Sequence, residues 1–129
     1  MTTAPEVAPV TRQLTQPMLN AYADASGDHN PIHIDEAFAK TTAMGGTIAH
    51  GMLVLSFISE MMTGAFGRAW LAGGRLDVRF RAPSRPGVTV TARARYTETK
   101  DGRHRYAVEC VSQTDEVLIA GTAELPGVM

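Results

Sequence analysis

The residues best suited to chemistry lie in one short stretch, Asp28-His29-Asn30-Pro31-Ile32-His33. Asp28 and His33 are five residues apart and do not share a helix face, because neighbours on a helix are three or four apart. Pro31 disfavours the α conformation at Asn30, so we expect a non-helical turn over residues 28–34 that points both side chains at one volume. An aspartate and a neutral histidine at one water site could supply the base and the acid for adding water to a conjugated thioester.

Each of these residues also has a purely structural explanation. Asp28 could cap the loop after a helix, and Asn30 could hydrogen-bond its own backbone. His33 could be a half-buried histidine with satisfied hydrogen bonds. Because Asp28 and His33 flank Asn30-Pro31 directly before a strongly apolar helix, we favour the functional interpretation.

A second candidate group lies where that apolar helix begins, at His50-Gly51. A helix N-terminus offers unpaired N–H groups and partial positive charge, and glycine allows a substrate to approach the backbone. The Gly51 N–H is therefore a candidate donor to the enolate oxygen of a thioester, although packing alone could also require a small residue there. His50 is expected to orient the loop by a hydrogen bond, and Asn30 and His50 are further candidates for the oxyanion and substrate-binding site. Ser59, near the same helix face as Gly51, could bond its own backbone or hold the substrate carbonyl or carrier.

A metal site has weaker support in the sequence. His33-Ile34-Asp35 with His50 could form a two-histidine, one-carboxylate iron site, but so short a pattern is common by chance. Nucleophile-elbow, dinucleotide-binding and P-loop motifs are missing, as is a cysteine pair for zinc. Cys110 is at an alternating strand position and is predicted to lie in the core.

The first half of the chain is predicted to be helical. One helix is expected over residues 16–25, with Thr15 as its N-cap, Pro17 in its first turn and Gly27 after its end. Asp35 could cap a short helical piece that reaches Ala39. The apolar residues of 49–65 point to all sides, which predicts a helix in the middle of the fold that ends near Gly64 and Gly67.

The second half is predicted to form strands. Apolar and polar residues alternate over 75–81 and 88–97, and two more strands are expected around residues 106–110 and 117–125. Asp101-Gly102 is a hairpin signal. Helices followed by a meander predict an α+β fold, in which an antiparallel sheet wraps around one buried helix.

Length and composition fit one domain, for which we expect residues 14–129, preceded by a tail or edge strand at residues 1–13. The formal net charge of −1 gives no case for a nucleic-acid or membrane partner. The longest apolar run is far below the ~20 residues that a membrane span needs. A single cysteine and the lack of a secretory signal pattern lead us to expect a cytoplasmic protein.

Basic residues are concentrated in the strand region. Residues 75–105 hold nine basic and three acidic side chains. A solvated sheet face would explain this concentration. Alternatively, Arg79, Arg81 and Arg85 could bind the phosphates of a carrier such as coenzyme A.

Three runs of the sequence resemble the MaoC-like, (R)-specific enoyl-CoA hydratase family. The first two are residues 22–33, with the Asp-x4-His element, and Ile48-Ala49-His50-Gly51-Met52-Leu53. The third is Val78-Arg79-Phe80-Arg81-Ala82-Pro83, with Pro86-Gly87 after it. The resemblance covers nearly everything from Leu14 to Leu125.

This resemblance implies a hot-dog fold and a homodimer whose two sheets join. It implies reversible hydration of a trans-2-enoyl thioester, carried by coenzyme A or acyl carrier protein, to the (3R)-hydroxyacyl product. Asp28 and His33 would hold the catalytic water, Gly51 would supply the backbone N–H, and Ser59 matches a serine of the family's helix. The resemblance implies neither a metal nor a redox cofactor. Coenzyme A would enter only as part of the substrate.

Two alternatives remain open at this point. A hot-dog thioesterase would also hold an acyl thioester against the buried helix, but it would release free thiol. A non-catalytic subunit of a heterodimeric dehydratase would need neither Asp28 nor His33, so their joint presence favours an active hydratase.

Overall fold

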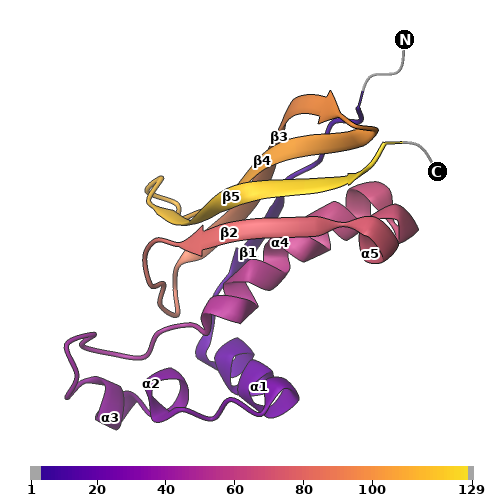
Figure 1. The fold of residues 1–129 in the computed structure, drawn as a ribbon. Coiled ribbons are helices and arrows are strands. Elements are labelled where there is room, and N and C mark those ends of the chain that lie inside the picture. The colour runs from indigo at the N-terminus through magenta and orange to yellow at the C-terminus, as the bar shows by residue number, and fades with distance from the viewer. Residues whose placement is uncertain (1–3, 128–129) are drawn as a thin grey trace.

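The computed structural model describes residues 4–127 of the chain. An antiparallel sheet packs around one long helix, and three shorter helices lie beyond the beginning of that helix (Figure 1). In chain order, the elements are β1 (Val10–Gln13), α1 (Gln16–Ser26), α2 (Pro31–Ile34), α3 (Glu36–Ala39), α4 (Gly51–Phe66), α5 (Arg68–Gly73), β2 (Arg75–Phe80), β3 (Thr89–Lys100), β4 (Arg103–Val111) and β5 (Val117–Pro126). No helix within residues 4–127 is long and apolar enough to cross a membrane.

The sheet has five strands in the order β1-β3-β4-β5-β2, and every neighbouring pair is antiparallel. β3 and β4 form the predicted hairpin, in which Asp101 and Gly102 have φ angles of 54° and 75°, as a tight Asp-Gly turn requires. β2 approaches β5 so closely that a Cβ on Gly121 would lie 2.0 Å from the Asp77 carbonyl oxygen. The two edges of the sheet are therefore β1 and β2.

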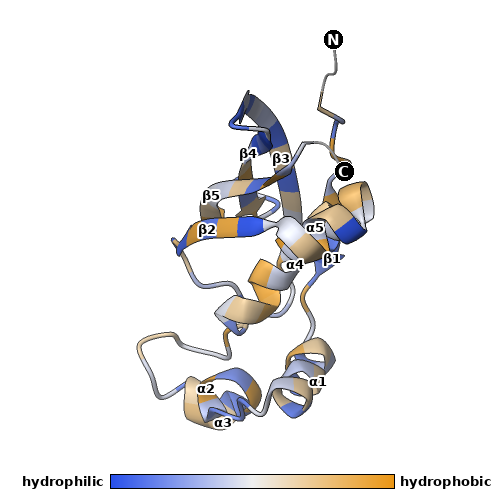
Figure 2. Cartoon of the chain, turned by 45° about the vertical axis from the view of Figure 1, so that its right-hand side comes forward, coloured by the Kyte–Doolittle hydropathy of each residue, from blue (hydrophilic) through white to orange (hydrophobic). Residues whose placement is uncertain are grey.

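Helix α4 supplies one side of the core. Six of its side chains are buried, namely Leu53, Val54, Phe57, Ile58, Met61 and Met62. Burying a side chain of this size stabilises the fold by ~1.5–3 kcal/mol. The predicted position of this helix in the middle of the fold is confirmed, but its first turn is partly uncovered, because Met52 is 58% exposed. Strand β2 also contains hydrophobic residues (Figure 2), and among them Phe80 is 55% exposed. Apolar surface therefore remains uncovered at the β2 edge of the sheet.

The helices before α4 follow from local capping. The Thr15 side chain accepts a hydrogen bond from the Met18 N–H, and Gly27 ends α1 in the left-handed conformation, as predicted. The Asp35 side chain likewise caps α3. The expectation of no helix over residues 28–34 is wrong in its second half, since α2 begins at Pro31. Proline fits the first helical position.

Helix α5 was not predicted from the sequence. Gly67, with φ of +56°, ends α4 and begins a further helical turn instead of a loop. Trp70 of α5 is only 7% exposed and belongs to the main hydrophobic core. The short helix therefore closes the core at the far end of α4.

Candidate active site

His33 lies on the single turn α2, and its tautomer is fixed by the backbone. The turn begins where the Asn30 side chain accepts a hydrogen bond from the Ile32 N–H at 3.1 Å. The His33 Nδ1–H donates to the Ile48 carbonyl oxygen at 2.8 Å. A carbonyl can only accept, so the proton of the neutral ring is on Nδ1 and the lone pair is on Nε2. The His33 side chain is 13% exposed, which leaves Nε2 as a sheltered base.

Asp28 faces that lone pair from the loop after α1. Its Oδ1 accepts a hydrogen bond from the Asn30 N–H at 3.2 Å, and its Oδ2 lies 3.8 Å from His33 Nε2. This separation is too long for a good hydrogen bond, yet one water ~2.8 Å from each atom fits between them. The Asp28 side chain is 53% exposed, so water can reach the pair. The structure thus brings together the two residues that the sequence predicted to meet.

His50 supports both members of this pair. Its Nε2–H donates to the Asp28 carbonyl oxygen at 3.0 Å, and its ring stacks on His33 with centroids 3.8 Å apart. Burial lowers the pKa of His50 below the ordinary 6.5, and the neighbouring His33 adds to this effect. Its Nδ1 is buried without a hydrogen-bond partner in the described part of the chain. Tyr22 covers the ring at a centroid distance of 4.8 Å.

Gly51 begins α4 immediately after His50, so the helix start adjoins the Asp28–His33 pair. The first N–H groups of this 16-residue helix have no partner within the helix, and its dipole is positive there. A Cβ on Gly51 would lie 3.0 Å from Cε1 of Phe80, so a side chain would crowd that ring. An apolar cavity of about 30 Å³ adjoins Gly51 and Phe80. The site therefore has a water position, backbone donors and an apolar wall.

Comparison with known proteins identifies the family. The family model described as "MaoC like domain" matches residues 2–117. A 3-hydroxybutyryl-CoA dehydratase of Methylorubrum extorquens is 34% identical over 103 residues, which cover 79% of this chain and 66% of that protein. The chain belongs to the MaoC-like dehydratase family. An (R)-specific enoyl-CoA hydratase of Rhodospirillum rubrum is 34% identical over 66% of this chain and 59% of its own length, so these two relatives extend beyond the matched region.

Solved structures support the same family and fold. The R-hydratase PhaJ1 from Pseudomonas aeruginosa superimposes with a TM-score of 0.84 at 28% identity and covers 97% of this chain and 81% of its own. The (R)-hydratase from A. caviae gives 0.82 at 26% identity, with coverage of 97% and 98%. These neighbours establish the hot-dog-like α+β architecture of this MaoC-like chain.

Ser59 is separated from the start of α4, where the helix adjoins the Asp28–His33 pair. Eight residues of helix separate it from Gly51, which is ~12 Å. Its Oγ accepts a hydrogen bond from the Trp70 indole N–H at 3.4 Å. Ser59 therefore lies near the middle of α4 and contacts Trp70 of α5, and its contact with substrate stays a prediction.

The three arginines proposed for carrier phosphate lie in β2 and in the segment that follows it. Arg79 pairs with Ala120 in the sheet, and Arg81 follows the end of β2. Arg85 lies in the next turn, where its Nη1 would be 3.4 Å from a Cβ on Gly46. All three are exposed, and their binding to a carrier phosphate stays a prediction.

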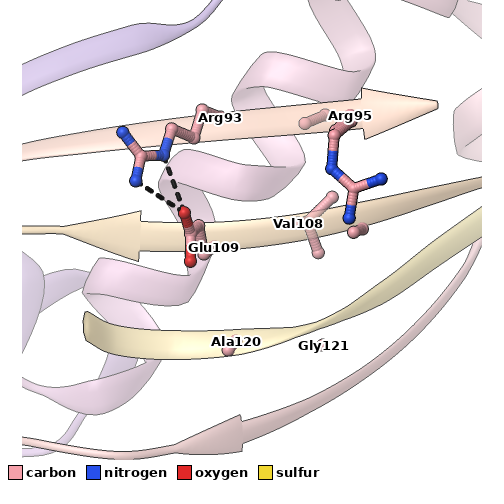
Figure 3. A pocket seen from close by; sticks show the side chains of 8 residues that line it. Arg93, Arg95, Val108, Glu109, Ala120 and Gly121 are labelled. Atoms are coloured by element: carbon pink, nitrogen blue, oxygen red, sulfur yellow. Dashed lines mark hydrogen bonds and ion pairs between the residues drawn. The ribbon is translucent and has the colours of Figure 1, made fainter. Parts of the chain in front are cut away.

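Other arginines of the strand region are paired with acids on the outer sheet face. A pocket of about 370 Å³ there includes Arg93, Arg95 and Glu109 in its lining. Figure 3 shows the Arg93–Glu109 ion pair, with an N–O distance of 2.7 Å. Hydrogen bonds from Arg103 and Arg105 lower the pKa of Glu124 despite the opposing effect of desolvation. Much of the basic stretch thus belongs to a solvated, ion-paired face.

The same geometry allows a test of the metal alternative. Potential ligand atoms of Asp28, His33 and His50 lie within 4.8 Å of one another, whereas Asp35 caps α3. The two imidazole planes are only 23° apart in a stack, so their in-plane lone pairs run side by side and do not converge on one ion. Stacked rings of this kind suit a water site better than a metal site.

Proposed function

We propose that this MaoC-like chain catalyses the reversible addition of water to a trans-2-enoyl thioester, which gives the (3R)-hydroxyacyl thioester. The observation that supports this most directly is the 3.8 Å separation of Asp28 Oδ2 and His33 Nε2. The thiol carrier would be coenzyme A, which the names of the dehydratase and hydratase relatives contain, or alternatively acyl carrier protein. In the proposed reaction, Asp28 and His33 hold and deprotonate the water.

In the hydration direction, the water oxygen forms a bond to C3 of the enoyl group while one O–H bond breaks. The proton passes to the Asp28–His33 pair, and a proton from this pair forms the new C2–H bond, so that water is added across the double bond. Negative charge develops on the thioester oxygen, where the Gly51 N–H donates. His50 holds the Asp28 backbone, and Asn30 fixes the turn that carries His33.

The activity is tested with the purified chain and a series of enoyl thioesters of increasing length. Hydratase activity removes the conjugated chromophore without releasing thiol, whereas a thioesterase would release thiol. Retention of the chromophore by every member of the series would contradict the proposal. Activity that appears only after a second chain is added would instead support the non-catalytic subunit of a heterodimeric dehydratase.

We also propose that the chain forms a homodimer through its β2 edge. Among the described residues, β2 pairs with β5 alone, and Phe80 at the end of β2 and Met52 in the first turn of α4 are both exposed. Pairing β2 with a second copy would satisfy its free backbone groups and cover these side chains. Light scattering should give twice the chain mass at micromolar concentration, and a species of 13.8 kDa would contradict the dimer.

A further inference from the structure

A chain of polar side chains is hydrogen-bonded to the backbone of His33. The Gln16 Nε2–H donates to the His33 carbonyl oxygen at 2.8 Å. The Gln16 Oε1 accepts a hydrogen bond from the Thr47 hydroxyl at 2.7 Å. Thr47 in turn approaches Glu36 Oε2 with its hydroxyl at 3.1 Å and its N–H at 3.2 Å. Four segments of the chain are thereby joined by hydrogen bonds in which at least one partner is a side chain.

Burial makes this arrangement costly to break. Thr47 is only 2% exposed, and a buried hydroxyl that loses its partners is destabilising. The Thr47 proton lies between two acceptors, so the carboxylate of Glu36 and the amide of Gln16 are held at the same point. Gln16 is also tied to its own helix, because its Nε2–H donates to Asn20 Oδ1 at 3.0 Å.

The residue after Thr47 provides the acceptor that sets the tautomer of His33. The Ile48 carbonyl oxygen receives the Nδ1–H of His33, and the Ile48 N–H donates to the Ile32 carbonyl oxygen at 3.1 Å. A small shift of the segment at residues 47–48 would therefore move the atom that keeps Nε2 directed at Asp28. Catalytic groups tolerate little displacement, since an error of about 1 Å can cost ~10²-fold in rate.

We propose that Gln16 and Thr47, anchored by Glu36, are positioning residues that hold His33 in its Nδ1–H tautomer with Nε2 facing Asp28. This inference rests on the proposed catalytic role of His33. Neither side chain contacts the water position. Their effect is transmitted through the His33 carbonyl oxygen and the Ile48 backbone.

The test uses three substitutions and one matched control. Thr47→Val removes the hydroxyl at nearly constant volume, Thr47→Ser keeps it, and Gln16→Met removes all three hydrogen bonds of the Gln16 amide, to Asn20, His33 and Thr47. Thr42→Val is the control, because the Thr42 hydroxyl donates to the Ala39 carbonyl oxygen in the same loop and has no contact with Gln16. Turnover, KM and the ¹⁵N chemical shifts of the His33 ring are measured for each folded variant.

We expect Thr47→Val and Gln16→Met to lower kcat about 10- to 100-fold with KM changed less than about threefold. Thr47→Ser should retain most of the activity, and Thr42→Val should match the unaltered protein. The ¹⁵N shifts should change from one Nδ1–H tautomer to a mixture in the two impaired variants. Unchanged kcat and unchanged shifts in both would overturn the proposal, as would an equal loss in Thr42→Val.

The ¹⁵N measurement tests the positioning role of Gln16 and Thr47 independently of the proposed hydratase activity. If the unaltered protein shows no hydratase activity, the proposed function fails while the tautomer of His33 still reports on Gln16 and Thr47. If Thr47→Val is too unstable to study, Gln16→Met and Thr47→Ser decide the outcome by the same two readouts.

Discussion

Asp28 and His33 should behave as one catalytic unit, which a double-mutant cycle can measure. Asp28→Asn preserves the shape of the side chain and the acceptor for the Asn30 N–H but removes the charge. His33→Gln removes the imidazole base. Oδ2 of Asp28 and Nε2 of His33 are 3.8 Å apart and share one water in the proposed mechanism. Either substitution should therefore remove most of the contribution of the pair to kcat.

The expected size follows from general acid–base catalysis. Each single variant should lose about 10²–10⁴-fold in kcat, or ~2.7–5.5 kcal/mol of transition-state stabilisation, with a much smaller change in KM. Independent groups would give a double variant slower by about 10⁴–10⁸-fold. Groups in contact are not additive, so the double variant should fall within about tenfold of the slower single variant.

A second aspartate–histidine pair supplies the control. Asp24 and His29 have the same five-residue spacing and a 3.0 Å contact, yet both are largely exposed. Asp24→Asn and His29→Gln should leave turnover within about twofold. The assay follows the enoyl thioester chromophore, with circular dichroism to confirm folding. Near-normal turnover in Asp28→Asn or His33→Gln would refute the role of that residue, and full additivity would refute the shared water.

Three further predictions concern stability and binding. Burial lowers the pKa of His50 below 6.5, so the unfolded chain takes up the proton first and the free energy of unfolding should fall as pH drops below about 6.5. His50→Asn should reduce this slope in denaturant titrations, and an unchanged slope would contradict the assignment. If Arg79, Arg81 or Arg85 binds carrier phosphate, its replacement by alanine should raise KM for the coenzyme A thioester at constant kcat, less so at high salt. Equal changes for a truncated thioester without the nucleotide would assign these arginines to a solvated face. Prolonged chelation should leave activity and thermal stability unchanged, whereas a chelator-sensitive enzyme with about one iron or zinc per chain would favour the metal alternative.

Local sequence rules predicted the parts of the fold that depend on neighbouring residues. The Thr15 cap, the Gly27 stop and the Asp101-Gly102 hairpin each need a few adjacent residues. The convergence of Asp28 and His33 also depends in part on adjacent residues, since the Asp28 and Asn30 side chains hydrogen-bond the backbone of the turn between them. The error over α2 arose from treating Pro31 only as a helix breaker, although proline is also favoured in a first turn.

Tertiary contacts account for what the sequence could not predict. The exposure of Met52 depends on which side of α4 the sheet covers, and the apolar pattern of the helix does not reveal this. Helix α5 depends on Trp70 packing into a core built from distant strands. The polar chain of Gln16, Thr47 and Glu36 joins residues up to 31 positions apart, and none of the three has a distinctive spacing.

The groups proposed to act on the reacting atoms, Asp28, His33 and the Gly51 N–H, come from residues 28–51, and most of that stretch lies beyond the sheet (Figure 1). Helices α1, α2 and α3 make their main helix contacts with one another, so this part of the molecule can open as a cooperative unit while the strands stay paired. Backbone amides there should exchange with solvent hydrogen at a lower opening free energy than those of β4. Substrate that bridges the Asp28–His33 pair and the Gly51 N–H would slow this exchange, because it ties the helical segment to the start of α4.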